Sequence, residues 1–550
     1  MRFPNLSLAA VILKGIIALS FLIVLRSTGV ALSLSQSNPA RDATSSPSVQ
    51  RSQTASPLPA LERAQDLISH EKLDEARSLL LRVLKTYPHE AALHNFLGVV
   101  DAQQGREPAA EQDFKRAIQE SPHYAGAYLN LGHLYQVEAG KNPEVRTKAI
   151  AIYRALLRFD SGNTEANYQY AVLQLQEGSY KDSLDHLLRL PSADQNMPRV
   201  LALFCADHAG LGELDLADSD ANRLLGSQNL TEADVLPILA VLQAHSTDLA
   251  IRLVEGLVKR QLASSRTLQQ LGKLYEQTGQ FERARSTLEE AAREQPQSAT
   301  PLVELARVAN QQRDYRGALG YLAHARALES QNAAIHFFFG IVCVELDLHQ
   351  EAYASLKKAV ALDPQNPYYN YALGAVCTQR EDAREAIGYF QKFCRLKPDD
   401  PRGILALGEA YFYSHDLVSA GKELKKIASN PESAAAASYF LGRIASEENR
   451  WAEAISDFKA ALRYHPQYAD AYAGLGRVYL TQRKYIQAEE ALQRAVQIEP
   501  DHYTANLNLM ILYERTKDKR AAAQAQRFAE IKKQRSERAK MFLRTIRIVP

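Results

Sequence analysis

The sequence predicts an all-α protein built from tandem helix–turn–helix units, and three regularities lead to this prediction. A small residue recurs every 34 positions in the second half of the chain, at Gly272, Ala306, Gly340, Gly374, Gly408, Gly442 and Gly476. Twelve positions further on, eight successive units all carry alanine, at Ala284, Ala318, Ala352, Ala386, Ala420, Ala454, Ala488 and Ala522. Prolines mark the joins at Pro296, Pro364, Pro398, Pro431, Pro466 and Pro500. A fixed period of this length is typical of repeat architectures.

Each unit reads as two helices joined by a short polar turn. In the last full unit, the face of a first helix is marked at i, i+3, i+4 and i+7 by Tyr472, Leu475, Gly476 and Tyr479. A second helix is marked by Ala488, Leu492 and Ala495. Pro500 ends that helix, because proline cannot continue it.

The recurring glycine requires a physical reason, since glycine inside a helix costs about 1 kcal/mol relative to alanine. We expect Gly476 to let the second helix pack directly against the first at Ala488. A large side chain at such a position should overpack the helix pair by roughly 1–3 kcal/mol.

The pattern resembles the tetratricopeptide repeat, a helix–turn–helix unit of 34 residues. The residues that match its consensus position by position are Tyr472, Leu475, Gly476, Tyr479, Ala488, Leu492, Ala495 and Pro500. A second matching set is Leu271, Gly272, Tyr275, Ala284, Leu288, Ala291 and Pro296. The resemblance implies a right-handed superhelical solenoid of about eleven or twelve repeats, with a concave surface lined by the first helices.

The repeat frame divides the chain into blocks. We expect a first repeat block over 60–191, degenerate helical repeats over 192–264, a second block over 265–529 and a basic tail over 530–550. Within the first block, Ala149 lies five residues beyond the position where the repeat pattern places its alanine, so we expect the segment 138–146 to bulge out. Pro198 and Pro237 interrupt the degenerate segment, where irregular packing is expected.

The N-terminal segment reads as an export signal. An apolar run over 15–25 follows Arg2 and Lys14 and is short for a membrane span, which favours a cleaved signal peptide over 1–31. An uncleaved membrane anchor is the alternative. Residues 32–59 are rich in Ser and Pro and predict a flexible linker. Both interpretations predict an exported protein, periplasmic or secreted.

Charge indicates no nucleic-acid partner, because the net charge is only +2. The segment from Arg515 to Arg547 is an exception, with twelve Lys or Arg residues against three acidic residues. The simpler interpretation is a solvated terminal helix. The alternative is a contact with an anionic membrane surface.

Signals of catalysis are weak, and we expect no enzyme activity, no cofactor, no small-molecule substrate and no metal site. His89 and His94 resemble a zinc-protease motif, but they are spaced one residue too far apart and would lie about 140° apart around a helix. The four cysteines show no paired spacing, which predicts buried free thiols. No block outside the repeats is long enough for a separate catalytic domain.

The resemblance implies a scaffold that binds proteins or peptides on its concave surface. Aromatic and apolar residues on successive first helices are the candidate contacts: Phe337, Tyr368, Tyr371, Leu405, Phe412, Tyr413 and Tyr439. The alternative is that these side chains fill gaps between helices. Two known modes of peptide binding in the family find no support here. Leu61 and Gln65 stand where a carboxylate clamp would begin, and only Asn130 and Asn508 occupy the positions of an asparagine ladder. A further alternative is an accessory arm of an enzyme complex, for example a glycosyltransferase or an envelope-assembly system.

Overall fold

The computed structural model describes residues 56–140 and 142–546, and their regular structure is entirely helical. The described residues form two compact units that divide between Leu274 and Tyr275. The predicted signal peptide and most of the predicted linker lie outside the described residues. No helix in the described part of the chain is both long enough and apolar enough to span a membrane.

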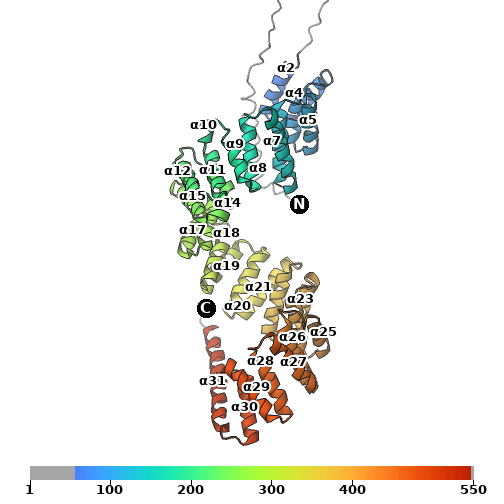
Figure 1. Cartoon of the computed structure of the whole chain (residues 1–550), viewed down its shortest axis with the longest axis vertical. Helices are drawn as coiled ribbons and strands as arrows, with labels where there is room; N and C mark the ends of the chain where they lie inside the picture. Colours follow the sequence, from blue (N-terminus) through green and yellow to red (C-terminus); the bar gives the residue numbers. More distant parts are fainter. Residues whose placement is uncertain (1–55, 141, 547–550) are drawn as a thin grey trace, which may run out of the picture. The chain divides into compact units, whose positions relative to one another are not determined.

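The first unit consists of antiparallel helix pairs that follow one another along the chain (Figure 1). Its helices are α2 (Leu58–Ser69), α3 (Leu73–Leu84), α4 (Ala91–Gln103), α5 (Glu107–Glu120), α6 (Ala125–Ala139), η1 (Pro143–Val145), α7 (Arg146–Phe159), α8 (Thr164–Gln176), α9 (Tyr180–Leu187), α10 (Ser192–Gln195), α11 (Pro198–Gly210), α12 (Leu214–Gly226), α13 (Glu232–Val235), η2 (Leu236–Ile238), α14 (Leu239–His245) and α15 (Thr247–Lys259). The boundary between the two units falls inside helix α16 (Ser265–Gln277).

Two stretches of the first unit depart from the regular pattern. Between α6 and α7, the 3₁₀ turn η1 takes up part of the segment where a bulge was expected. Between 192 and 264, α11 and α12 form an ordinary pair, whereas α10, α13 and η2 are each one turn or less. Pro198 begins α11, and Pro237 lies in η2, because proline fits the first turn of a helix but not its interior.

The second unit contains α17 (Phe281–Glu294), α18 (Thr300–Gln311), α19 (Tyr315–Leu328), α20 (Ala333–Glu345), α21 (His349–Leu362), α22 (Pro367–Gln379), α23 (Ala383–Leu396), α24 (Pro401–Tyr413), α25 (Leu417–Ile427), α26 (Ala434–Glu447), α27 (Trp451–Tyr464), α28 (Ala469–Thr481), α29 (Tyr485–Ile498), α30 (Tyr503–Thr516) and α31 (Ala521–Ile546). From α18 onward, each first helix packs closely on the second helix of its own pair, and each second helix packs on the first helix of the next pair. The pairs of this unit therefore share buried surface with their neighbours, as tandem repeats require.

The small residues lie between paired helices, as the sequence predicts. A methyl group built on Gly408 would stand 2.6 Å from Cγ of Leu424, and one on Gly476 would stand 2.4 Å from Cγ of Leu492. The expected contact between Gly476 and Ala488 is corrected, because another residue lies closest to Gly476. The side chain of Leu492, one helical turn beyond Ala488, fills the space beside Gly476, and only the backbone oxygen of Ala488 approaches it, at 3.4 Å.

Seven of the eight aligned alanines are completely buried, and the eighth is exposed. The exception is Ala522 in α31. Helix α31 begins four residues after the left-handed residue of its turn, Lys517, whereas α29 begins two residues after the equivalent Arg483. The face that α31 turns to the core is therefore displaced, and Ala521 packs there instead.

In the second unit, one residue in the turn of each helix pair has a left-handed backbone. In the second unit this residue recurs every 34 positions and is glycine only at the first of them: Gly279, Arg313, Asp347, Glu381, His415, Asn449, Arg483 and Lys517. Left-handed backbone costs roughly 1 kcal/mol or more for residues other than glycine. The turns therefore share one geometry that the packing of the helix pairs enforces.

Candidate functional site: an aromatic groove in the second unit

A groove of about 570 Å³ opens in the second unit between the first helices α22 and α24, with α23 at its floor. This volume lies within the roughly 300–1,000 Å³ range of ligand-binding pockets. The groove is lined by Tyr371, Ala375, Thr378, Gln379, Glu381, Ala383, Phe390, Ala406, Glu409 and Tyr413. Small side chains on α22 and α24 leave the space open, and two tyrosines border it.

Two of the predicted contact residues, Tyr371 and Tyr413, line this groove. Tyr413 is 49% exposed, although it ends a helix whose opposite face is core. The ring of Tyr371 is half-buried and packs against Phe390 and Phe393, with centroids 5.6 and 5.1 Å away. The groove therefore combines one fixed and one exposed aromatic ring.

The other predicted contact residues lie outside the groove lining. Tyr368 is exposed at the start of α22, while Phe337 on α20 stacks against Tyr369 at 4.8 Å. Leu405 packs with the apolar core around α24 and α26. For Phe412 the structure gives a correction, because its ring is only 4% exposed and belongs to that same core. Helix α24 turns Phe412 inward and its neighbour Tyr413 outward.

Tyr439 on α26 packs among other aromatic rings and does not line the groove. Its ring packs against Phe440, Phe458 and Tyr468, with centroid distances of 5.2, 6.0 and 5.1 Å. Burial raises the pKa of its hydroxyl to about 12, so the phenol stays neutral at physiological pH. Tyr439 thus belongs to an aromatic cluster adjoining the groove.

Two charged residues at this site, Glu409 on α24 and Arg443 on α26, were not predicted from the sequence. Burial raises the pKa of the Glu409 carboxyl to about 7, and the positive charge of Arg443 partly opposes that rise. The guanidinium of Arg443 lies 4.2 Å from the centroid of the Phe412 ring and within 6 Å of Tyr413, Tyr439 and Phe440. Each charged residue directly follows the small residue of its repeat, but Ile341 and Ala375 occupy the same position in other repeats, so the position gives no signal of charge.

The residues considered for chemistry lie apart from one another. The imidazole of His89 contacts Glu120 at 3.2 Å, whereas that of His94 contacts the backbone oxygen of Pro88 at 2.9 Å. Among the described residues, no group of three or more His, Cys, Asp or Glu side chains could hold a metal ion. Cys205, Cys343 and Cys377 are free and buried, and burial raises the pKa of each thiol to about 12.

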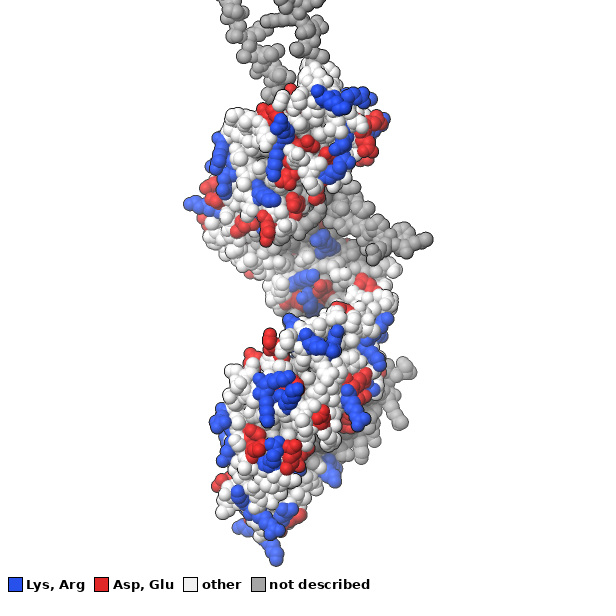
Figure 2. All heavy atoms as spheres, turned by 90° about the vertical axis from the view of Figure 1, so that its right-hand side faces the viewer, with Lys and Arg blue, Asp and Glu red and all other residues white. Residues whose placement is uncertain are grey.

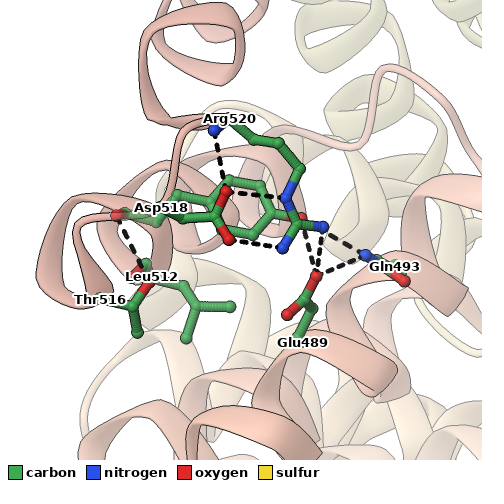
Figure 3. Close-up of polar contacts among 7 residues, drawn as sticks. Glu489, Gln493, Leu512, Thr516, Asp518 and Arg520 are labelled. Carbon is green, nitrogen blue, oxygen red and sulfur yellow. Dashed lines mark hydrogen bonds and ion pairs between the residues drawn. The ribbon is translucent and has the colours of Figure 1, made fainter.

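The beginning of the basic C-terminal segment is tied to the repeats by ion pairs (Figure 3). Arg520 donates hydrogen bonds to Asp518 at 2.7 Å and to Glu489 on α29 at 2.5 Å. Arg527 on α31 pairs with Asp501. These two cations dock α31 against the array, so part of the positive charge in this segment is satisfied within the molecule.

Charge is mixed rather than segregated on the face that Figure 2 shows, where basic and acidic side chains alternate over both units. No broad field of one sign is seen on that face.

Family models for the tetratricopeptide repeat match residues 61–125, 146–204, 265–308, 303–367, 344–401, 405–469, 441–502 and 474–534, well over half of the chain. No curated protein matches the sequence.

Several solved structures are similar to the chain. One is the Cut9–Hcn1 hetero-tetramer of the APC/C, 17% identical over 84% of this chain and 90% of that chain, with a TM-score of 0.35. PilF of Pseudomonas aeruginosa is 25% identical over 38% of this chain and 94% of that chain, with a TM-score of 0.33. A tetratricopeptide repeat protein from Parabacteroides merdae is 16% identical over 45% of this chain and 98% of that chain, with a TM-score of 0.37. On the extent of the repeat matches and the helix pairs described above, the chain belongs to the tetratricopeptide repeat family.

Proposed function

We propose that the protein is a non-catalytic scaffold that binds a segment of a partner protein in the groove between α22 and α24. The observation that carries this proposal is the groove itself, in which Tyr371 and Tyr413 border about 570 Å³ of open space. Exposed tyrosine rings supply contact area at a small cost in conformational entropy, and they are enriched at protein interfaces. The repeats and the turns between them account for nearly all described residues, which supports a binding role.

The test is a comparison of two tyrosine variants with equal exposure. Tyr413 is 49% exposed in the groove, and Tyr464 is 48% exposed on α27, outside it. Partners recovered with the tagged full chain would be identified by mass spectrometry and purified. Their affinity for the wild type, Tyr413→Ala and Tyr464→Ala would then be measured by calorimetry.

We expect Tyr413→Ala to weaken binding by about 2 kcal/mol, as truncation of an aromatic anchor does. Tyr464→Ala should bind like the wild type. Equal affinity of all three proteins would show that the partner binds elsewhere. An enzyme recovered as the groove-dependent partner would make the protein an accessory arm of that enzyme.

We also propose that the protein acts outside the cytosol. The support is the sequence of residues 1–31, a basic start followed by a short apolar run and small residues. N-terminal sequencing of the mature chain would distinguish a cleaved signal from an anchor. Retention of the whole chain in the cytosol would refute export.

A further inference from the structure

The carboxylate of Glu409 lies in the groove without a bonding partner in the described part of the chain. Its side chain accepts no hydrogen bond there and has no cation within 4.0 Å. A half-buried carboxyl in such surroundings lowers the stability of the fold, and burial accordingly raises its pKa to about 7. The carboxylate oxygens are not among the fully buried atoms that lack a hydrogen bond, so they are open to the groove, where a ligand can reach them.

Arg443 on α26, whose positive charge opposes the rise in the pKa of Glu409, is held by other contacts. Its guanidinium stacks over Phe412 at 4.2 Å and lies near three further rings, in a position that aromatic faces stabilise. It acts on Glu409 only through space and does not line the groove. The position of Arg443 thus leaves the carboxylate free for a group from outside.

The lining of the groove has one sign of charge. Its two charged residues are Glu409 and Glu381, and the remaining lining residues are apolar or neutral. Glu381 is exposed, in the turn between α22 and α23, so one carboxylate lies within the groove and the other at its edge. A cation that enters the groove therefore passes the carboxylate of Glu381 at the edge and then reaches that of Glu409 inside.

We propose that Glu409 binds a lysine or arginine side chain of the partner segment, with Tyr371 and Tyr413 packing against the apolar stem of that side chain. This inference rests on the proposed function of the groove. A charged hydrogen bond to the carboxylate gives directional recognition, while the rings contact the methylene groups and attract the cation. The groove selects a partner segment with a basic residue among apolar neighbours.

The test uses a displayed library of random twelve-residue peptides, selected on the immobilised full chain. Peptides that are enriched would be synthesised in three forms: as selected, with the basic residue replaced by norleucine, and with it replaced by glutamate. Affinities would be measured for the wild type, Glu409→Gln and the matched control Glu490→Gln. Glu490 is an exposed carboxylate on α29, outside the groove.

We expect the enriched peptides to share a lysine or arginine at one position. Either norleucine in the peptide or Glu409→Gln should weaken binding roughly 10- to 100-fold, the range expected for loss of a hydrogen bond between charged groups. The two changes together should cost little more than either alone, because they remove the same contact. Glu490→Gln should leave the affinity unchanged. A melting curve for Glu409→Gln would show that the variant is folded, since the amide has the shape of the carboxyl.

The remaining outcomes separate this inference from the proposed function. Peptides that lose affinity with Tyr413→Ala but lack a basic residue, or that bind Glu409→Gln normally, would overturn the inference and leave the groove as the binding site. Selection of acidic peptides that depend on Arg443 would also overturn it. Absence of any peptide sensitive to Tyr413→Ala would refute both the groove and the inference.

Discussion

The packing role of the small residues can be tested with two glycines of one helix pair. Gly408 lies inside α24, where an added methyl group would stand 2.6 and 2.7 Å from Cγ and Cδ2 of the buried Leu424. Gly421 lies inside α25, where an added methyl group would meet nothing within 4 Å. Both glycines are helical, so alanine gains about 1 kcal/mol of helix propensity at either position. Their difference therefore isolates the packing contribution.

We expect Gly421→Ala to stabilise the second unit by about 1 kcal/mol. In Gly408→Ala the same gain is opposed by overpacking of roughly 1–3 kcal/mol, because the added methyl group would press on the fully buried Leu424. The two variants should thus differ by roughly 1–3 kcal/mol, with Gly408→Ala the less stable.

The measurement is urea unfolding of the full chain by circular dichroism, combined with amide hydrogen exchange of α24 and α25. Exchange is needed because a repeat array can unfold in parts. A Gly408→Ala protein as stable as Gly421→Ala would refute the argument that close approach of the paired helices requires a small residue here.

Three further predictions concern charged residues. Burial raises the pKa of Asp207 to about 8, so the folded protein keeps a proton that the unfolded chain loses near pH 4. The contribution of Asp207 to the free energy of unfolding should therefore fall as pH rises from about 4 to 8. At pH 8, Asp207→Asn should be more stable than the wild type by a few kcal/mol in urea unfolding, and this difference should narrow towards pH 4. Asp101 is 1% exposed and accepts hydrogen bonds from Arg77 at 2.7 Å and Arg106 at 2.6 Å, so Asp101→Ala should cost roughly 1.5–3 kcal/mol in urea unfolding. Arg520→Ala should speed amide exchange in the first turns of α31, and unchanged exchange there would show that its ion pairs do not dock the helix.

The helix pairs could be predicted from the sequence because their signal is repeated. Any single glycine or alanine is weak evidence, but Gly408 and Ala420 recur in register many times. Ala522 continues the sequence period but is exposed, because α31 begins later after its left-handed turn residue than α29 does. The sequence period gives no information on such a local change once the repeats end.

The groove could be predicted only in part. Periodicity places Tyr371 and Phe412 on first helices, but the direction of each ring depends on the angle between neighbouring pairs. Phe412 is therefore buried in the core, whereas Tyr413 is exposed. Glu409 and Arg443 were missed because isolated charges on a helix are usually solvated. Their burial follows from the close packing of successive first helices, which no local pattern records.

The left-handed turn residues have a consequence for how the gene can change. Because the turns at Arg313, Asp347 and Glu381 share one backbone geometry, 34 residues apart, they are interchangeable junctions. Recombination that removes or duplicates 102 base pairs would join one turn to its counterpart, and every helix pair in the product would keep a complete second helix. Array length can therefore vary in whole units between generations while the pairs on either side of the crossover stay intact.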